Sequence, residues 1–595
     1  MLLQPIDWMI VGLFFLVSLT IGIAVTRKAG TSTAEFFAAG RSMPWWLLGI
    51  SMVATTFSTD TPNLVTNFVR EEGVAGNWRW WAFLISGMLT VFVYARLWRR
   101  SGVLTDLEFY ELRYSGKSAA FVRGFRAIYL GVFFNVIIMA SVTLAAIKIG
   151  SVLLNLTPIQ TILIASTVTV IYSSLGGLRG VLITDVIQFA MAMIGAVGAA
   201  YIALQRPEVG GLSGMLSHPD LQGKLSLLPD FTNPNQRDLL IGMFLMPVMV
   251  QWWSVWYPGA EPGGGSYTAQ RMLAAKDENN ALGAVFLFNA AHYALRPWPW
   301  IIVALCSIIV FPSLDSLREA FPHAASIVGN DMGYPAMLTF LPAGLLGLVV
   351  ASLIAAYMST ISTHLNWGAS YIVHDCYQRF IRPDSSEKEL VLVGRISTVV
   401  LMILAAMLAL NLESARGNFE IILQVGAGTG LIFILRWFWW RINAYSEITA
   451  MAVSFPVAVY LKVIHEKLGY TPIDSDLQLV LTVAITTAAW VLVTFLTPAS
   501  SEETLRNFCK LIRPGGPGWR HFTKDLPDAA PGETAWQVPQ GILCMMLGCV
   551  SIYSVLFATG YWLYGRYGLA SSLTALAIVS AVILTRQWRA FIAHS

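Results

Sequence analysis

Charged residues are scarce in this sequence of 595 residues. Only 12% of them are Asp, Glu, Lys or Arg, and 56% are hydrophobic, whereas soluble globular proteins carry about 25% charged residues. A water-exposed surface over this length cannot be built from so few charges. The sequence therefore predicts an integral membrane protein, and a net charge of +4 is too small and too scattered to indicate nucleic-acid binding.

Motifs that mark several other classes of protein are missing as well. No GxxxxGK[ST] loop is present, which disfavours an ATP-driven pump, and no HExxH motif or GxSxG elbow supports an enzyme. The first apolar run, 6–25, includes Asp7 and has no small-residue cleavage site after it, so we expect a retained helix. Neither a zinc site nor a disulfide framework is indicated, because no CxxC or CxxH spacing occurs among Cys306, Cys376, Cys509, Cys544 and Cys549.

Long apolar runs are abundant instead. A spanning helix needs about 20 apolar residues, and about fifteen segments are long enough: 6–26, 44–66, 78–98, 122–152, 158–175, 181–204, 238–257, 280–312, 338–374, 389–412, 418–440, 445–465, 476–497, 538–563 and 568–586. Basic residues gather on alternate connections, so the positive-inside rule predicts an outside N-terminus and a cytoplasmic C-terminus. The expected location is the plasma membrane, which in a bacterium is the inner membrane.

Two of these runs contain residues that a membrane helix disfavours. The second holds an acid and a proline within 54–62, and the seventh is rich in proline and glycine over 257–267. Each interruption opens a block of five predicted helices, 44–204 and 238–440, as two inverted repeats require. A simple proline kink is the alternative for the first interruption taken by itself. Two interruptions in matching places favour freed backbone carbonyls that can bind a cation.

The ninth run is dense in hydroxyl groups. Ser359, Ser362 and Thr363 have the spacing i, i+3 and i+4, which places them on one helix face, and Thr360 adds a fourth hydroxyl within five positions. Hard cations bind several oxygen ligands, so this cluster suits sodium. The alternative is that each hydroxyl bonds a carbonyl of its own helix or packs against a neighbouring helix.

Asp185 lies one turn into another apolar helix. A carboxylate inside the membrane is energetically costly and therefore indicates function. The alternative is an acid near the interface that interacts with the positive end of its own helix dipole. Position alone leaves the two interpretations open.

Several ordered motifs resemble the sodium:solute symporter family, the relatives of sodium/glucose and sodium/proline transporters. They are EFFAAGRSMPWW at 35–46, GGLRG followed by Thr184, Asp185 and Gln188, QRMLAAK at 270–276, and LPAGLLGL at 341–348 through Asp375. The resemblance extends over about residues 5–450. It implies an all-α polytopic membrane protein with a leucine-transporter-like core of two inverted five-helix repeats.

This resemblance also implies a division of the chain. We expect an extra helix and loop at 1–43, a first repeat at 44–204, an extracytoplasmic loop at 205–237, a second repeat at 238–441, two extra helices at 442–497, a cytoplasmic linker at 498–537, and two C-terminal helices with a tail at 538–595.

The family pattern, carried over by position, implies two sodium sites. The first would use the carbonyls of Ala54, Phe57 and Ala356 with the hydroxyls of Ser359 and Thr360. The second would use Asp185 with Ser359, Ser362 and Thr363. Sodium is thus the expected coupling ion, with one or two ions bound and two favoured, and no organic cofactor is expected.

The substrate is less closely defined. In sugar-carrying relatives an acid grips the sugar where this sequence has Trp80, and a lysine lies where it has His292. Aromatic faces suit the C–H side of a pyranose, and Arg296 suits a carboxylate. Membrane-belt or packing roles are the alternatives for the tryptophans and for His292, and Arg296 could instead pair with Asp60. The candidate cavity comprises Asp60, Thr61, Trp80, Phe83, Gln251, Trp253, Trp256, Tyr257, His292 and Arg296.

We therefore predict sodium-coupled uptake of a small polar solute by alternating access. A sugar or sugar derivative ranks slightly above an organic acid or amino acid. A proton-coupled transporter would titrate Asp185 or His292, but a proton needs one basic site and not a cage of hydroxyls. A sensor is disfavoured because the chain ends about ten residues after its last helix. A membrane enzyme is disfavoured because its candidate groups lie on different helices. The bilayer is the expected environment, with no nucleic acid and no obligate protein partner.

Overall fold

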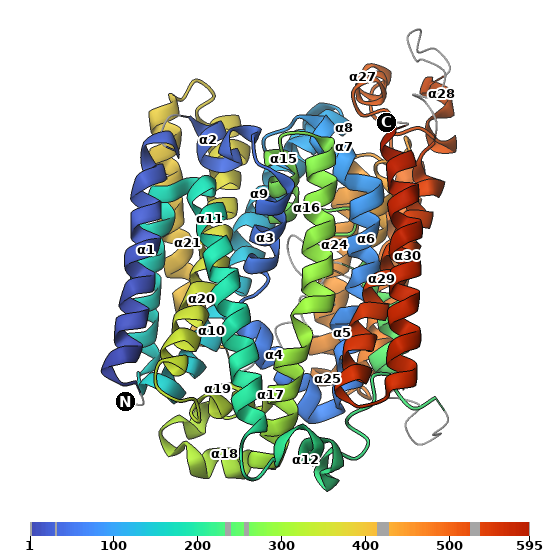
Figure 1. The fold of residues 1–595 in the computed structure, drawn as a ribbon. Coiled ribbons are helices and arrows are strands. Elements are labelled where there is room, and N and C mark those ends of the chain that lie inside the picture. The colour runs from blue at the N-terminus through green and yellow to red at the C-terminus, as the bar shows by residue number, and fades with distance from the viewer. Residues whose placement is uncertain are drawn as a thin grey trace.

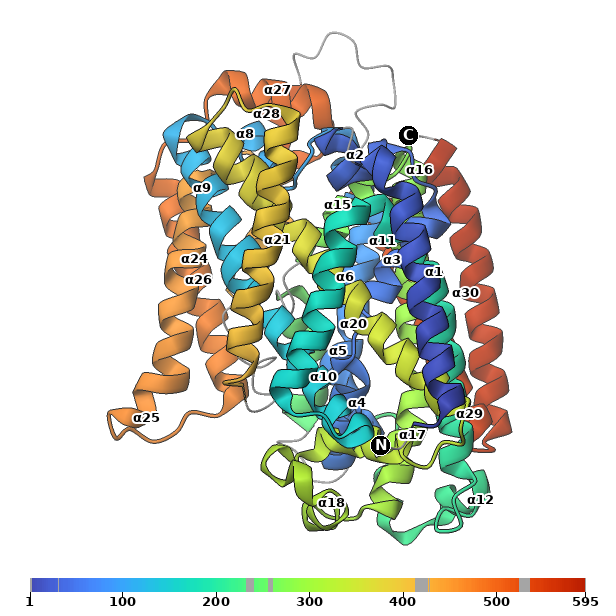
Figure 2. The ribbon, with the colours of Figure 1, turned by 90° about the vertical axis from the view of Figure 1, so that its left-hand side faces the viewer.

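The computed structural model describes residues 3–29, 32–231, 240–254, 261–412, 426, 428–523 and 536–593. Within these ranges the chain is a bundle of long helices (Figures 1 and 2) without a β-strand, and an isolated bridge joins Met43 to Ala275. Ten helical segments of the described residues are long and apolar enough to span a membrane. The predicted all-helical membrane fold is confirmed, whereas the predicted number of fifteen spans is not.

The N-terminal half contains twelve of the labelled helices. They are α1 (Pro5–Ala29), α2 (Thr33–Ala38), α3 (Trp45–Thr55), α4 (Asp60–Glu72), α5 (Trp78–Trp81), α6 (Phe83–Leu89), α7 (Ala95–Ser101), α8 (Glu108–Arg113), α9 (Gly116–Ile128), α10 (Asn135–Leu154), α11 (Pro158–Leu204) and α12 (Gly211–Ser217). Two π-helical segments, η3 (Thr90–Tyr94) and η4 (Tyr129–Phe134), join α6 to α7 and α9 to α10, so that each pair continues as one long helix.

The second predicted helix is broken where the sequence suggests. Helix α3 ends at Thr55 and α4 begins at Asp60, which leaves residues 56–59 outside regular helix. Pro62 lies in the first turn of α4, where its missing N–H costs no helical hydrogen bond. The break therefore interrupts the backbone inside the bundle and lies beside the long helices α10 and α17.

Helix α11 covers the residues of two predicted helices. Its 47 residues would extend roughly 70 Å if straight, more than twice the thickness of the hydrocarbon core. Gly177 has φ 53° and ψ −165° inside this element, a conformation open mainly to glycine. The chain therefore turns at Gly177, between the two segments that the sequence predicts as 158–175 and 181–204. The second of them lies within a candidate span, Gly177–Leu204, whereas the first contains the shorter apolar helix Pro158–Ile171.

The second half repeats the pattern of a broken helix followed by long ones. Its helices are α14 (Met246–Met249), α15 (Ser266–Ala274), α16 (Glu278–Ala290), α17 (Pro297–Val310), α18 (Leu314–Ala320), α19 (Gly333–Leu338), α20 (Leu345–Ser370), α21 (Glu387–Ala409) and α23 (Gly430–Leu435). The π-helical segments η7 (Ile241–Leu245), η9 (Ala291–Leu295) and η12 (Tyr371–Ile381) precede α14, link α16 to α17 and extend α20. Helices α20 and α11 pack along each other.

The second break is described from residue 261 onward. Gly263 and Gly264 have φ 87° and 84°, so the chain cannot enter α15 as a continuous helix. Asp106 Oδ2 accepts the Ser266 N–H at 2.8 Å and satisfies a free donor in the first turn of α15. Glu261 pairs with Arg126, and Arg436 Nη2 lies 3.8 Å from its other oxygen. The acid within this break is thus held by two buried arginines.

The last helices flank the core. They are α24 (Ala444–Val459), α25 (His465–Lys467), α26 (Ser475–Leu496), α27 (Glu502–Ile512), α28 (Arg520–Thr523), α29 (Val538–Leu563) and α30 (Tyr567–Ala593), with the π-helical η13 (Tyr460–Ile464) between α24 and α25. Helix α24 packs on α26 and α29 packs on α30. The N-terminus, α12 and α18 lie at one end of the bundle, and the C-terminus, α27 and α28 lie at the other (Figures 1 and 2).

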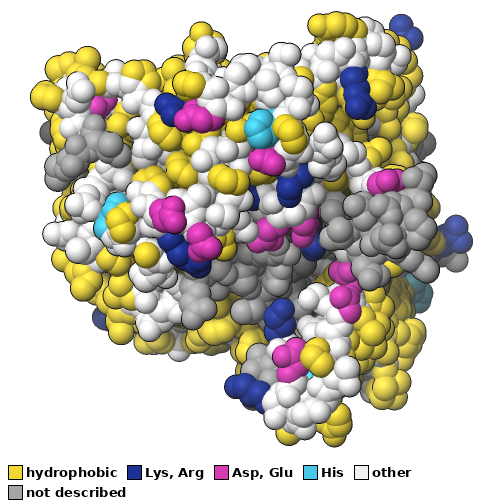
Figure 3. Space-filling view, turned by 90° about the horizontal axis from the view of Figure 1, so that it is seen from below, with side chains coloured by type: hydrophobic (Ala, Val, Ile, Leu, Met, Phe, Trp, Pro, Cys, Tyr) yellow, Lys and Arg dark blue, Asp and Glu magenta, His cyan; other side chains and the backbone are white. Residues whose placement is uncertain are grey.

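The end that carries α12 and α18 is seen from below in Figure 3. Acidic and basic side chains are scattered over it, and hydrophobic side chains gather toward its edges. This end holds the N-terminus and the described part of 205–237, so the N-terminus and the loop that are predicted to be extracytoplasmic lie on one side.

The predicted start of the ninth helix is wrong. The sequence suggests a helix over 338–374, but α19 ends at Leu338 and α20 begins only at Leu345. Pro342 supplies no backbone N–H, and Gly344 has φ 85°, so the intervening residues turn before the helix starts. The hydroxyl-bearing part of the helix is unaffected, because it lies well inside α20.

Candidate functional site

Asp185 is the acidic centre of a polar cluster buried between helices. It lies in the second part of α11 and is fully buried. Ser51 of α3 donates its hydroxyl proton to Asp185 Oδ2 at 2.5 Å, and Ser359 of α20 donates to Oδ1 at 2.6 Å. Three helices from distant parts of the sequence are therefore joined at one carboxylate, and a role limited to the dipole of its own helix does not account for these bonds.

The hydroxyls of α20 continue this cluster. Thr360 Oγ1 donates to the Thr55 carbonyl at 2.7 Å, and Thr363 Oγ1 lies 3.2 Å from Thr55 Oγ1. Ser362 instead donates to the carbonyl of Ser359 in its own helix at 3.2 Å, as hydroxyls in membrane helices often do. Three of the four hydroxyls thus contact other helices, and the own-helix alternative holds for Ser362 alone.

This bonding pattern leaves oxygen lone pairs available for a cation. Ser359, Thr360 and Ser362 each use their proton in a bond to a protein acceptor. A hydroxyl that donates its proton still has acceptor lone pairs, and a hard cation binds through such oxygens. The oxygen atoms of this cluster are therefore of the kind that binds sodium.

The backbone part of the predicted first site lies at the end of α3. Ala54 and Phe57 are buried, as is Ala356 of α20. The Phe57 N–H donates to the Ala54 carbonyl at 3.0 Å and to the Val53 carbonyl at 2.9 Å. A carbonyl oxygen has two lone pairs, so this bond leaves one on Ala54 for a cation.

The positively charged side chain of Arg271, in α15, also lies in this polar cluster. It is not among the site residues predicted from the sequence. Its Nη2 donates to Thr363 Oγ1 at 2.8 Å and lies 3.4 Å from Ser51 Oγ. Both hydroxyls also belong to the network around Asp185. The buried guanidinium is thus linked to the buried carboxylate through hydroxyls, which reduces the cost of placing each charge in the membrane.

A second cluster contains three of the predicted substrate residues. The Trp80 ring stacks on Tyr293 with centroids 5.7 Å apart, and its edge meets His292 at 5.4 Å. The Trp80 indole N–H donates to Asn77 Oδ1 at 2.8 Å, which fixes the ring. Trp80 is therefore buried among aromatic side chains, and a place in a membrane-interface belt does not describe it.

Arg296 completes this cluster and contacts the first helix break. Its Nη1 donates to the Val53 carbonyl and to Thr56 Oγ1, both at 3.1 Å, and its Nη2 lies 2.6 Å from His292 Nδ1. Among the described residues no carboxylate lies within ion-pair distance of Arg296, so the suggested pairing with Asp60 is not formed. Arg296 Nε has no hydrogen-bond partner among the described residues.

The remaining predicted substrate residues are arranged less tightly. Thr61 donates to the Thr56 carbonyl at 3.1 Å, and Asp60 precedes it at the start of α4. Gln251 is held by the Arg79 carbonyl at 2.5 Å, and the Trp253 indole bonds the Met249 carbonyl of its own segment at 3.1 Å. Phe83 is buried in α6. Trp256 and Tyr257 lie outside the described residues.

Two consecutive threonines connect the clusters. Thr55 contacts Thr360 and Thr363 on the side of Asp185. Thr56 Oγ1 lies 3.1 Å from both His292 Nδ1 and Arg296 Nη1 on the other side. The end of α3 therefore belongs to both networks, and a shift there moves both. Neither threonine is among the predicted site residues, although Ser51 and Thr55 have the i, i+4 spacing of one polar face in an apolar helix.

The chain is similar to known transporters over most of its length. The model of the sodium:solute symporter family matches residues 36–453. The sodium/glucose cotransporter of Vibrio parahaemolyticus is 27% identical over 481 residues, which are 77% of this chain and 86% of that protein. The sodium/myo-inositol cotransporter 2 of Oryctolagus cuniculus is 28% identical over 74% of this chain and 67% of its own.

A solved structure has the same fold. A Na+-coupled sialic acid symporter in a substrate-bound, outward-open state superposes with a TM-score of 0.65 at 20% sequence identity, covering 84% of this chain and 99% of the other. At that identity the likeness concerns the fold. Together with the family match over residues 36–453, it shows that this chain is a membrane transporter that belongs to the sodium:solute symporter family.

Proposed function

We propose that the chain carries a sugar or sugar derivative into the cell together with sodium, and that the end of α3 couples the two. The observation that carries this proposal is the adjacency of Thr55 and Thr56, one in the network around Asp185 and the other in the network of His292 and Arg296. A cation that fixes the end of α3 also fixes a group beside the substrate cluster. Such coupling is reciprocal, so bound solute also strengthens sodium binding.

The proposed ion sites are those that the family pattern implies. At the first site, one sodium ion binds the carbonyls of Ala54, Phe57 and Ala356 and the hydroxyls of Ser359 and Thr360. A second ion binds Asp185, Ser359, Ser362 and Thr363. What supports the second site is a buried carboxylate that already meets one hydroxyl from α20 at 2.6 Å. We further propose a plasma-membrane location with the N-terminus outside, and two inverted repeats over 44–204 and 238–441.

A sugar is favoured by the aromatic surface and by the relatives. Trp80 and Tyr293 offer stacked rings, and aromatic faces suit the C–H face of a sugar. The similar proteins named above include sodium cotransporters of glucose and myo-inositol. This chain has Trp80 and His292 where sugar carriers have an acid and a lysine, so its preferred sugar is expected to differ from theirs.

An organic acid is the second candidate substrate, and Arg296 is the observation that favours it. This guanidinium is fully buried, and its hydrogen bonds go to the Val53 carbonyl, Thr56 and His292, while the Asp60 carboxylate acts on it only from beyond ion-pair distance. A substrate carboxylate would supply a directly bonded negative charge and a forked acceptor. A sugar acid would satisfy both this cation and the aromatic surface.

Uptake into proteoliposomes tests these proposals. Purified protein is challenged with labelled glucose, galactose, myo-inositol, sialic acid, glucuronate and proline, under an imposed sodium gradient or an imposed proton gradient. We expect sodium-driven uptake of at least one neutral sugar or sugar acid. Preference for glucuronate over glucose identifies the acid, preference for proline contradicts the sugar proposal, and uptake driven equally by protons contradicts sodium coupling.

Trp80 provides a focused test of the substrate cluster. Replacing it with leucine removes the stacked ring, and we expect KM for the transported solute to rise about tenfold, or ~1.4 kcal/mol, with little change in sodium half-saturation. The matched control is Trp78→Leu. Trp78 contacts Phe244 and Tyr553 instead, so its loss should lower thermal stability more than it raises KM. Equal KM effects of the two substitutions would argue against a substrate role for Trp80.

A further inference from the structure

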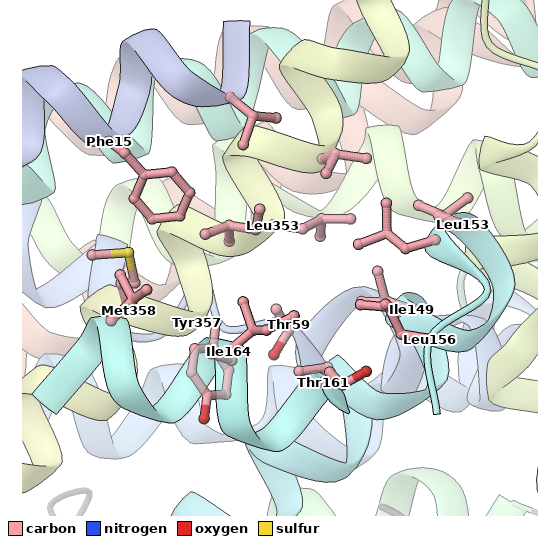
Figure 4. Close-up of a pocket in the computed structure, with 18 of the residues that line it drawn as sticks. Phe15, Thr59, Ile149, Leu153, Leu156, Thr161, Ile164, Leu353, Tyr357 and Met358 are labelled. Carbon is pink, nitrogen blue, oxygen red and sulfur yellow. The ribbon is translucent and has the colours of Figure 1, made fainter. Parts of the chain in front are cut away.

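A separate cavity of about 310 Å³ lies between four helices, away from the His292 and Arg296 cluster. Helices α1, α10, α11 and α20 supply almost all of its wall, and Thr59, in the first helix break, supplies one further side chain. Figure 4 shows Ile149, Leu153 and Leu353 facing its interior. Its volume is at the lower end of the range for small-molecule sites.

The wall cannot hold a polar solute. Nearly every lining side chain is aliphatic or aromatic, and only four carry a polar group: Trp8, Thr59, Thr161 and Tyr357. Thr59 Oγ1 donates to the Val142 carbonyl at 3.2 Å, and the Tyr357 hydroxyl lies 3.3 Å from Thr143 Oγ1, so these two groups are already engaged with the protein. Thr161 Oγ1 has no hydrogen-bond partner among the described residues, and a single hydroxyl is too little to bind a polar solute. A cavity of this kind does not hold water well, and neither a sugar nor sodium would find ligands there.

The mouth of the cavity opens at the outer surface of the bundle. Trp8 and Ile164, which line it, are 45% and 56% exposed. The surface next to them is apolar as well, since Ile159 and Leu163 are 60% and 61% exposed. These residues lie in two shorter apolar helices, Pro5–Ile21 and Pro158–Ile171. In a membrane protein, an apolar outer surface of this kind is suited to contact with lipid hydrocarbon.

We propose that this cavity binds an acyl chain of a membrane phospholipid. A chain that enters gains dispersion contacts with a wall that otherwise lacks neighbours on one side, and it leaves its own polar headgroup outside. The wall that it contacts includes Thr59 in the helix break and Tyr357 and Met358 of α20, which follow Ala356 and precede Ser359 in the chain. An acyl chain there supports the helix positions on which the proposed first sodium site depends, so lipid and sodium binding are coupled.

Electron microscopy of the protein in nanodiscs tests the binding directly. The nanodiscs contain phosphatidylcholine with one acyl chain brominated at its middle, or the same lipid without bromine. We expect bromine density between α1, α10, α11 and α20 in the first sample only, and its loss in Ala165→Phe, which fills the cavity from its wall. Bromine density no stronger there than around the rest of the bundle overturns the proposal.

Sodium titration tests the coupling. Ala165→Phe is expected to change the sodium concentration for half-maximal uptake by about fivefold, the lower end of typical coupling between two sites. The matched control is Leu163→Phe on the same helix, outside the cavity, which should leave this concentration unchanged. If Ala165→Phe removes the bromine density but leaves sodium half-saturation unaltered, the coupling is wrong. The density measurement does not depend on transport, so its failure is distinguishable from failure of the proposed function.

Discussion

Replacing Ser359 with alanine is expected to abolish sodium-driven uptake while the protein remains folded. Ser359 belongs to both proposed sodium sites, and its hydroxyl joins α20 to Asp185 at 2.6 Å. Each site loses an oxygen ligand, so sodium affinity should fall more than about tenfold. The cost to stability is about 1 kcal/mol for one buried hydrogen bond. Uptake over a sodium titration measures the first effect, and thermal unfolding without sodium measures the second.

Ser352 provides the matched control on the same helix. It lies two turns earlier in α20, is buried, and donates to the Val349 carbonyl at 2.8 Å. Ser352→Ala should therefore have a similar effect on stability and leave the sodium titration unchanged. Wild-type sodium half-saturation in Ser359→Ala, or equal losses of uptake in the two variants, would remove Ser359 from the ion sites.

Asp185→Asn is expected to separate the two sodium sites. The substitution preserves the size of the side chain but removes the only carboxylate among the proposed ligands. The first site, which consists of carbonyls and hydroxyls, should persist, whereas the second should lose its ion. We expect the sodium Hill coefficient to fall from about two to about one. Uptake at a fixed low sodium concentration should fall about tenfold or more.

Two further variants make this prediction specific. Ser362→Ala removes a neutral ligand of the second site alone, so it should also lower the Hill coefficient but reduce uptake less than Asp185→Asn. Ser51→Ala removes one of the two bonds to Asp185 and retains the charge, so two-ion behaviour should persist. A wild-type coefficient near one that Ser362→Ala does not change would show that the second site does not exist.

Features with a local chemical signal were predictable from the sequence. Pro62 and Asp60 within an apolar run indicate the break that the structure places between Thr55 and Asp60. The four hydroxyls between Ser359 and Thr363 indicate a polar face before any partner is known. In such cases the residues themselves are costly in a membrane helix, so their presence requires an explanation.

Features that depend on distant contacts were not predictable. Thr55 and Thr360 are 305 positions apart, and Arg271 meets Ser51 across 220 positions, so no local pattern announces these pairs. Helix boundaries failed for a different reason. Gly344 takes a backbone conformation that a hydropathy window does not detect, and the late start of α20 follows from that conformation.

Thermal unfolding of the purified protein tests the central claim, that sodium and solute stabilise one native arrangement together, most directly. Unfolding is followed across the solute panel in equal concentrations of sodium chloride or potassium chloride, because a ligand that binds only the native state raises its apparent stability. We predict that sodium raises Tm above the value in potassium, and that the transported solute raises Tm further only when sodium is present. Equal Tm values in the two salts, together with a solute shift that does not depend on sodium, would contradict this account.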